Sequence, residues 1–240
     1  MRLLLVNAAA ACLVILLAGL AVWQVQRRAW KLELISRIDQ RVHAAPTAPP
    51  ERPQWPEVTA ARDEYRRVVV RGIWLARRPV LVRAVTELGG GFWVMSPLVR
   101  DDGTTVLVNR GFVPEERRNE AAATQPPAGS RTVTGLLRMS EPRGAFLQTN
   151  DPAGDRWFSR DVAAIAGARD LPATAPYFID ADRTGWQGGD PVPGLTIVAF
   201  SNNHLVYALT WAALALMTAA ASVFFTLHAL GHRGLSGRRR

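Results

Sequence analysis

The chain has 240 residues, a formal net charge of +9 and a single cysteine, Cys12. One cysteine excludes an intramolecular disulfide and any metal site built from paired thiols. The excess of basic residues comes without a zinc-finger or RNA-binding signature, so it does not indicate a nucleic-acid partner. Much of it flanks two apolar segments, which is typical of contact with lipid headgroups.

Residues 1–26 are predicted to form a first transmembrane helix. No charged residue occurs between Leu3 and Gln26, and about 20 apolar residues in a helix span the bilayer core. A cleaved signal peptide is the alternative, because Gly19 and Ala21 occupy suitable cleavage positions. The apolar run is longer than the roughly 7–15 residues of a signal sequence, so we expect an uncleaved anchor.

Residues 27–44 are predicted to continue this helix out of the membrane, and residues 45–57 to form an extended linker. Trp30, Leu34 and Ile38 recur every fourth residue and share one helix face. Prolines then follow in close succession, and proline cannot continue a helix. The prolines of this linker are Pro46, Pro49, Pro50, Pro53 and Pro56.

Residues 58–203 are predicted to form a β-rich domain outside the membrane. Short segments rich in β-branched and aromatic residues alternate with glycine, proline or Asp-Gly turns, which indicates strands. "RDDGTT" is predicted to be a hairpin turn, and "DVAAIAGA" a helix capped by Asp161. We expect a mainly antiparallel sandwich or partly closed barrel. The predicted strands are "YRRVVVRGIW", "PVLVRAV", "GFWVMSPLV", "TTVLVNRGFVP", "RTVTGLLRM", "YFIDA" and "LTIVAF".

Residues 204–228 are predicted to form a second transmembrane helix, and residues 229–240 a basic cytoplasmic tail. The tail has arginines and no acid, which favours the cytoplasm. Arg27, Arg28 and Lys31 on the loop side of the first helix favour the opposite orientation. Long loops translocate largely regardless of charge, so the short tails decide. We expect both termini in the cytoplasm and the β domain outside.

The sequence contains no phosphate loop, serine nucleophile elbow or zinc-protease motif. "ELGGGFW" is interpreted as a loop between strands. Asp151, Asp155 and Asp161 could supply paired carboxylates for acid–base chemistry, but turn and capping roles explain them better. Arg110 in "VNRGFVP" is interpreted as a structural ion pair or a partner contact rather than a group that activates a substrate. A membrane-anchored enzyme is therefore disfavoured.

His204 in "SNNHLVYALTW" stands directly before the second apolar run. It could remain wet at the interface while Asn202 or Asn203 caps the helix. It could instead ligate a haem iron through a neutral imidazole. On a helix, His204 shares a face with Tyr207 or Ala208, and with Trp211 one turn further on. Alanines on this face would leave room for a macrocycle or for close packing of the first helix.

Several segments together resemble the surfeit locus protein one family of cytochrome c oxidase assembly factors. The resemblance extends from Gly19 to about Ala215, with the motifs in the family's order. Phe112 replaces the family's usual tryptophan, which is a mild departure. The motifs are "GLAVWQVQRRAWKLELI", "VLVNRGFVP", "NDP" with "WFSRD", "PYFID" and "GDPVPGLTIVAFSNNHLVYALTWAALAL".

The resemblance implies a protein of two transmembrane helices that assists maturation of the oxidase subunit carrying haem a. It implies haem a as a transient cofactor and His204 as an iron ligand, and the shared helix face then makes Tyr207 and Trp211 the expected neighbouring contacts. The expected partners are the oxidase core subunit, other assembly factors and membrane lipid, with no enzymatic activity. No long Ser- and Arg-rich leader precedes the first helix, so we expect a bacterial inner-membrane protein with a periplasmic domain. The alternative is a chaperone that stabilises an assembly intermediate without binding haem.

Overall fold

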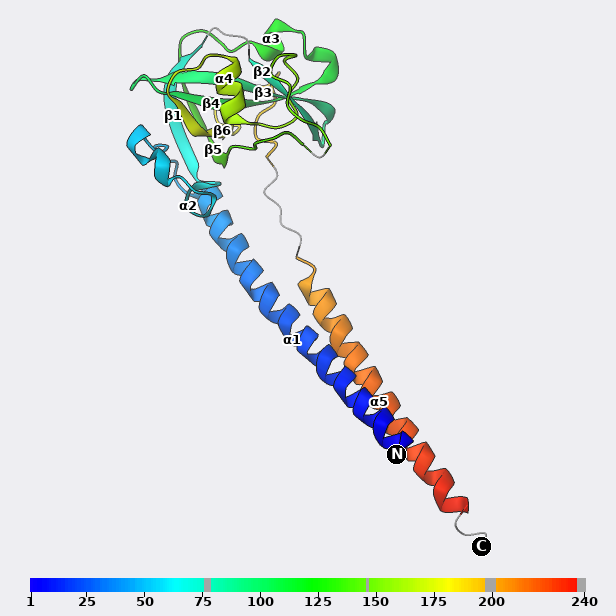
Figure 1. Cartoon of the computed structure of the whole chain (residues 1–240). Coiled ribbons are helices and arrows are strands. Elements are labelled where there is room, and N and C mark those ends of the chain that lie inside the picture. Colours follow the sequence, from blue (N-terminus) through cyan, green and yellow to red (C-terminus); the bar gives the residue numbers. More distant parts are fainter. Residues whose placement is uncertain (76–78, 146, 197–201, 237–240) are drawn as a thin grey trace. The chain divides into compact units, whose positions relative to one another are not determined.

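The computed structural model describes residues 1–75, 79–145, 147–196 and 202–236. Two compact units are present (Figure 1). The helix pair consists of Met1–Arg37 and α5 (His204–Ser236), and the barrel domain consists of Ile38–Val198. Helix α1 (Arg2–His43) contributes its last residues to the barrel domain.

The helix pair is antiparallel, and polar contacts join its two members near both ends of their contact. Asn7 Oδ1 accepts hydrogen bonds of 3.1 Å from Ser222 and Thr226. Gln24 lies 2.7 Å from His204 at the start of α5. Both helices are long and apolar enough to cross a membrane. Hydroxyl and amide side chains are the groups that hold helices together where lipid surrounds them.

The barrel domain is a closed five-stranded barrel with one additional strand. The barrel order is β1 (Arg67–Trp74), β5 (Ser130–Met139), β6 (Thr174–Ala181), β4 (Thr105–Pro114) and β3 (Gly89–Arg100). Closure comes from β3, whose last residues pair with β1, while its first residues pair with the additional strand β2 (Val80–Thr86). The pairs are antiparallel except for the parallel pair β4–β6. The predicted partly closed barrel is confirmed, and the sandwich is not formed.

The barrel interior is filled by alternate residues of all five barrel strands. Its buried residues are Val68, Val70, Leu98, Val106, Val108, Leu137, Ala175, Tyr177 and Ile179. A second cluster covers the opposite face of β4 and β6, where Val162 and Ile165 of helix α4 (Val162–Ala168) pack against Leu107 and Phe178. Strand β4 is therefore buried on both faces, which explains its nearly continuous apolar sequence.

The local elements follow from a few residues. Asp161 accepts a hydrogen bond from Ala164 N and caps α4, as predicted. Gly103 in the β3–β4 turn has φ +78°, the left-handed conformation that favours glycine. The "ELGGGFW" glycines were expected in a loop, but the turn is confined to Glu87 and Leu88, and β3 begins at Gly89. Short helical segments complete the domain: α2 (Ala60–Asp63), α3 (Ala121–Thr124) and two 3-10 turns at Arg52–Glu57 and Glu115–Arg117.

The proline-rich segment is folded against the barrel instead of running free as an extended linker. Trp55 and Val58 pack against the interior cluster. The Pro50 carbonyl accepts hydrogen bonds from the Tyr177 hydroxyl at 2.6 Å and from Trp55 Nε1 at 3.3 Å. Thr47 pairs with Val68 of β1. The segment therefore closes one end of the barrel.

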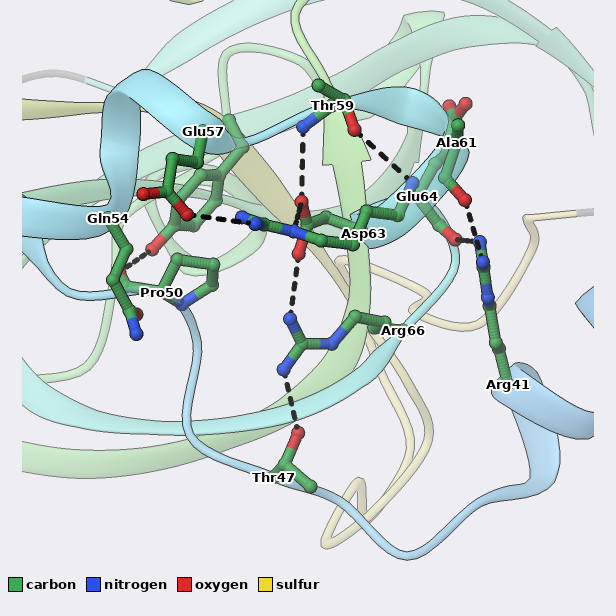
Figure 2. Close-up of polar contacts among 12 residues, drawn as sticks. Arg41, Thr47, Pro50, Gln54, Glu57, Thr59, Ala61, Asp63, Glu64 and Arg66 are labelled. Carbon is green, nitrogen blue, oxygen red and sulfur yellow. Dashed lines mark hydrogen bonds and ion pairs between the residues drawn. The ribbon is translucent and has the colours of Figure 1, made fainter.

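A buried carboxylate, Asp63, orders the short stretch of chain that follows the proline-rich segment. Asp63 accepts hydrogen bonds from Arg66 at 2.7 Å, from Arg62 at 2.9 Å and from the Thr59 backbone N–H at 3.1 Å. Figure 2 shows how these side chains converge, and how Arg41 from the end of α1 donates to nearby backbone carbonyls. Burial alone would raise the pKa of Asp63, but the hydrogen bonds outweigh burial and hold it below its ordinary value.

The last predicted strand, "LTIVAF", lies mostly outside the described residues. Leu195 and Thr196 are described and belong to no strand.

Candidate functional site

His204 is the first residue of α5, and its ring is oriented by a single partner in the helix pair. Its Nδ1 lies 2.7 Å from Gln24 Oε1. Because an amide oxygen only accepts hydrogen bonds, this contact places the ring proton on Nδ1. Nε2 then keeps a free lone pair, which is the form in which a neutral imidazole binds a metal ion. An outer partner that fixes the tautomer is typical of metal-ligating histidines.

The other two predicted contact residues, Tyr207 and Trp211, differ in how exposed they are in the helix pair. Trp211 is partly buried, on the side of α5 that also carries the buried Ala208 and Ala215. Tyr207 is 54% exposed. The two alanines are buried within the helix pair, so of the two roles considered for them they serve close helix packing. A flat ligand at His204 would therefore lie on the exposed side, next to Tyr207.

The start of α5 shows no cap from the Asn202 side chain among the described residues. The Asn203 backbone carbonyl accepts the Tyr207 N–H at 3.3 Å, and this is how the helix starts. Asn202 Oδ1 is buried and has no hydrogen-bond partner in the described part of the chain. In the described part of the chain, the His204 ring is hydrogen-bonded to Gln24 and to neither asparagine side chain. The imidazole, with its tautomer set by Gln24, satisfies the donor chemistry that a haem iron requires.

Three motifs that lie far apart in the sequence meet at Asp180 of β6, which is 3% exposed. Asn109 Nδ2 and Arg160 Nη1 donate to one carboxylate oxygen at 2.8 and 3.0 Å. Arg138 Nη1 and the Thr196 hydroxyl donate to the other at 3.0 and 2.8 Å. Sequence reasoning missed this network. Its signal was a polar residue at the end of each of three apolar motifs, "VLVN", "WFSR" and "YFID".

The Asp180 network is structural because its charges are matched. Arg160 also binds Glu141 at 2.6 Å. Burial alone would lower the pKa of Arg160, but the carboxylates of Asp180 and Glu141 outweigh burial and raise it. A guanidinium held between two carboxylates has no free charge to offer a substrate. The network joins β4, β6 and the segment before α4.

The three aspartates considered for acid–base chemistry have separate structural partners. Asp151 pairs with Arg156 at 2.6 Å, and Asp155 pairs with Arg169 at 2.6 Å. Asp161 caps α4. No two of them form a pair. Within the described residues, no group of three or more His, Cys, Asp or Glu side chains is placed to hold a metal ion.

Arg110 has no carboxylate within ion-pair distance among the described residues, contrary to one of its two predicted roles. Its Nη1 donates to the Thr124 carbonyl at 2.9 Å, and its guanidinium lies 5.8 Å from the centre of the Trp74 ring. Burial lowers the pKa of Arg110 to about 10, with no acidic group opposing the effect. The remaining interpretation from sequence is a partner contact.

These features define a class of protein: a barrel domain flanked in sequence by two apolar helices, with a metal-competent histidine at the start of the second. The SURF1 family model matches residues 11–216, so the chain belongs to the SURF1 family. "Surfeit locus protein 1" of Rattus norvegicus is 36% identical over 210 residues, which are 80% of this chain and 66% of the rat protein. The chain thus spans slightly less than two thirds of that relative.

Two further relatives of the same name cover more of their own length. The Homo sapiens protein is 36% identical over 218 residues, 83% of this chain and 70% of the human chain. The Takifugu rubripes protein is 35% identical over 211 residues, 80% of this chain and 85% of the fish chain. The similarity therefore includes both the barrel domain and the helices that flank it.

Proposed function

We propose that this protein is an assembly factor for cytochrome c oxidase that binds haem a and presents it while the core subunit matures. The observation that carries the proposal is the 2.7 Å contact between His204 Nδ1 and Gln24 Oε1. It leaves Nε2 as the only ring nitrogen able to ligate iron. Membership of the SURF1 family supports the same conclusion.

In this proposal each residue binds or orients, and none performs catalysis. His204 holds the iron through Nε2, Gln24 keeps the proton on Nδ1, Tyr207 supplies an aromatic contact, and Trp211 supports the site by packing within the helix pair. The bound haem a supplies the redox chemistry once it is in the oxidase. The partners are the oxidase core subunit, other assembly factors and membrane lipid. The protein acts in a bacterial inner membrane, with the barrel domain in the periplasm and both termini in the cytoplasm.

An absorption spectrum of the purified full chain tests the cofactor. Protein made in cells that synthesise haem a should carry the absorption bands of haem a. Protein from otherwise identical cells unable to make haem a should lack them. A spectrum without haem, together with co-purification of oxidase subunits, would favour the alternative chaperone that stabilises an assembly intermediate.

Deletion of the gene tests the pathway. We expect lower cytochrome c oxidase activity and lower haem a content in the membrane, with the bc complex and other haem proteins near normal. The defect should be selective because the protein serves one maturation step. A general loss of membrane haem would indicate haem synthesis or export, and unchanged oxidase activity would end the proposal.

A further inference from the structure

A recess of about 260 Å³ opens on the barrel domain, and no side chain of the Asp180 network lines it. Arg110 of β4, Trp74 of β1 and Thr132 of β5 line it, and the loop that follows β6 adds Trp186. Two contacts lie within this loop: the Trp186 indole donates to the Gly189 carbonyl at 3.2 Å, and the Arg183 guanidinium lies 5.7 Å from the centre of the Trp186 ring. The recess is therefore a shaped feature with aromatic and basic walls.

The acidic residues on the recess wall are already neutralised. Asp182 pairs with Arg67 at 3.0 Å and accepts the Thr184 N–H at 2.8 Å. Asp190 pairs with Arg117. Neither lies within ion-pair distance of Arg110. The recess thus keeps two guanidinium groups, those of Arg110 and of the exposed Arg131, that have no carboxylate within ion-pair distance in the described part of the chain.

A further group near the Arg110 guanidinium also lacks a partner. Trp74 Nε1 is buried and makes no hydrogen bond with the described residues. Buried polar groups are almost always satisfied, so an orphaned donor beside an uncompensated cation marks a place where an acceptor is missing. One N–H of the Arg110 guanidinium donates to the Thr124 carbonyl, and its other N–H groups remain available as donors. A carboxylate matches these requirements because it accepts two parallel N–H bonds from one guanidinium.

The size of the recess decides between kinds of carboxylate. Sites for whole small molecules generally measure about 300–1,000 Å³, and this recess is smaller, at about 260 Å³. It suits one side chain. Its walls carry arginine and tryptophan, the residue types that dominate binding energy at protein interfaces. Rigid prolines at its edge, Pro127, Pro191 and Pro193, limit the entropy lost when a partner docks.

We propose that this recess is a docking site for an acidic side chain of a partner polypeptide, bound by the guanidinium of Arg110. The site does not depend on haem ligation at His204. It gives the "VNRGFVP" motif a function in recognition: β4 holds Arg110 at the recess wall, and because no described residue serves as its counter-ion, its charge is left for the partner.

The test uses the full chain in lipid nanodiscs, labelled with ¹⁵N at its tryptophan indoles. The probe is N-acetyl-glutamate N-methylamide, and the neutral control probe is N-acetyl-glutamine N-methylamide. The Trp74 indole resonance, assigned by its loss in Trp74→Phe, should shift saturably with the glutamate probe and stay in place with the glutamine probe. Equal shifts with both probes would overturn the proposal, because the recess would then not recognise charge.

Two substitutions examine the site from opposite directions. Arg110→Gln should weaken glutamate-probe binding about tenfold or more, because hydrogen bonds to charged groups are the strong ones. Thr132→Glu, at an exposed position on the recess wall, should also block the probe by supplying an internal carboxylate. The matched control is Arg71→Gln, which removes the same charge from an exposed position of β1 outside the recess. It should bind the probe like the unaltered chain.

The outcomes separate this proposal from the haem proposal. Circular dichroism melting establishes that each variant is folded, and Thr132→Glu carries the test if Arg110→Gln unfolds. Loss of probe binding with haem content unchanged supports a polypeptide docking site. Unchanged probe binding in both variants overturns it. Loss of haem from Arg110→Gln with unchanged probe binding also overturns it and assigns the recess to a propionate of the macrocycle.

Discussion

His204 shows how one hydrogen bond can prepare a side chain for a ligand. An imidazole with two free nitrogens can bind through either, whereas the contact with Gln24 Oε1 leaves only Nε2 available. Gln24 is itself 9% exposed and belongs to the first helix, so His204 and its hydrogen-bond partner come from opposite ends of the sequence. The sequence pattern indicated the histidine but not the glutamine, because no spacing rule links residues on different helices.

Replacing His204 separates ligation from helix packing. His204→Ala should lose co-purified haem a while still inserting in the membrane, and should also lose the bond to Gln24, a cost of about 1 kcal/mol. His204→Gln retains a donor for Gln24 and should lose haem to the same extent. Absorbance and membrane insertion are the measurements. Full haem occupancy with an unaltered spectrum in both variants would refute ligation.

Three further variants should differ in how much haem they retain, according to what each substitution removes. Gln24→Leu removes the orienting partner only and should reduce haem affinity about 10- to 100-fold, as expected for second partners of metal ligands. Trp211→Ala removes packing and should weaken haem retention less than His204→Ala does. Asn203→Ala, at the backbone start of α5, should keep haem.

The carboxylate of Asp180 is expected to contribute strongly to the stability of the barrel domain. Asp180→Asn would leave the guanidinium groups of Arg138 and Arg160 without their shared carboxylate oxygens. Removing one partner of a buried ion pair typically costs about 3–5 kcal/mol. We expect a loss of this size in the free energy of unfolding, measured by urea titration of the full chain. Glu57→Gln, in an exposed pair with Arg62, is the control and should change stability little.

At the scale of elements, the sequence indicated most strands but not how they close. The segments around Val68, Leu81 and Phe178 alternate or run apolar, and each became a strand in the structure. The parallel pairing of β4 with β6 and the β1–β3 closure join residues distant in sequence. Local periodicity carries no information on such pairings, because it records which face of a strand is buried and not which strand lies beside it.

The candidate site was predictable to a similar degree. His204 was visible as a lone imidazole before an apolar run, and Arg110 as a basic residue within a strand motif. Whether Arg110 had an internal counter-ion depended on where Asp182 and Asp190 found partners, and these lie on other elements. The proline-rich segment was interpreted as a linker because prolines end helices. Trp55 and Pro50 of this segment contact barrel residues that are distant in sequence, and no local sequence pattern records such contacts.

The bond between Tyr177 and Pro50 ties the proline-rich segment to the barrel interior. Tyr177→Phe should reduce the free energy of unfolding by about 0.5–1.5 kcal/mol at neutral pH, because one hydrogen bond is lost while Trp55 Nε1 still satisfies the Pro50 carbonyl. Thermal unfolding of the full chain measures the difference. Tyr177→Phe leaves no large cavity, so a loss of unfolding free energy as large as a core cavity causes would contradict this assignment.

The same hydroxyl predicts a dependence on alkaline pH. Burial raises the pKa of Tyr177 from 10.0 to about 12. The unfolded chain therefore releases this proton first, so the contribution is complete below pH 10 and is lost as the pH rises towards about 12. The stability difference between the unaltered chain and Tyr177→Phe should shrink across this window. Other titrating groups are common to both chains and cancel. A constant difference would show that the hydroxyl is not protected by burial.

At the scale of the whole molecule, the proposed topology assigns the barrel domain and the two termini to sides of a membrane. Two spans put both termini on one side of a membrane and the intervening domain on the other. The haem proposal requires the domain to be on the side of the membrane where the oxidase core subunit matures, and the docking proposal requires it to be on the side where its partner polypeptide lies. Orientation is therefore the property on which both depend.

The orientation can be measured with paired reporters. Alkaline phosphatase, which is active only in the periplasm, should be active when inserted in the exposed β2–β3 turn at Glu87–Leu88 and inactive when fused after Arg240. The turn is preferred to the linker because Pro49 is buried and an insertion there would disturb the end of the barrel. A cytoplasmic reporter, such as green fluorescent protein, should give the opposite result at each position. The physical reason is the basic, acid-free tail, which we expect to be retained on the cytoplasmic side. Active phosphatase after Arg240 would reverse the topology and remove the barrel domain from the periplasm.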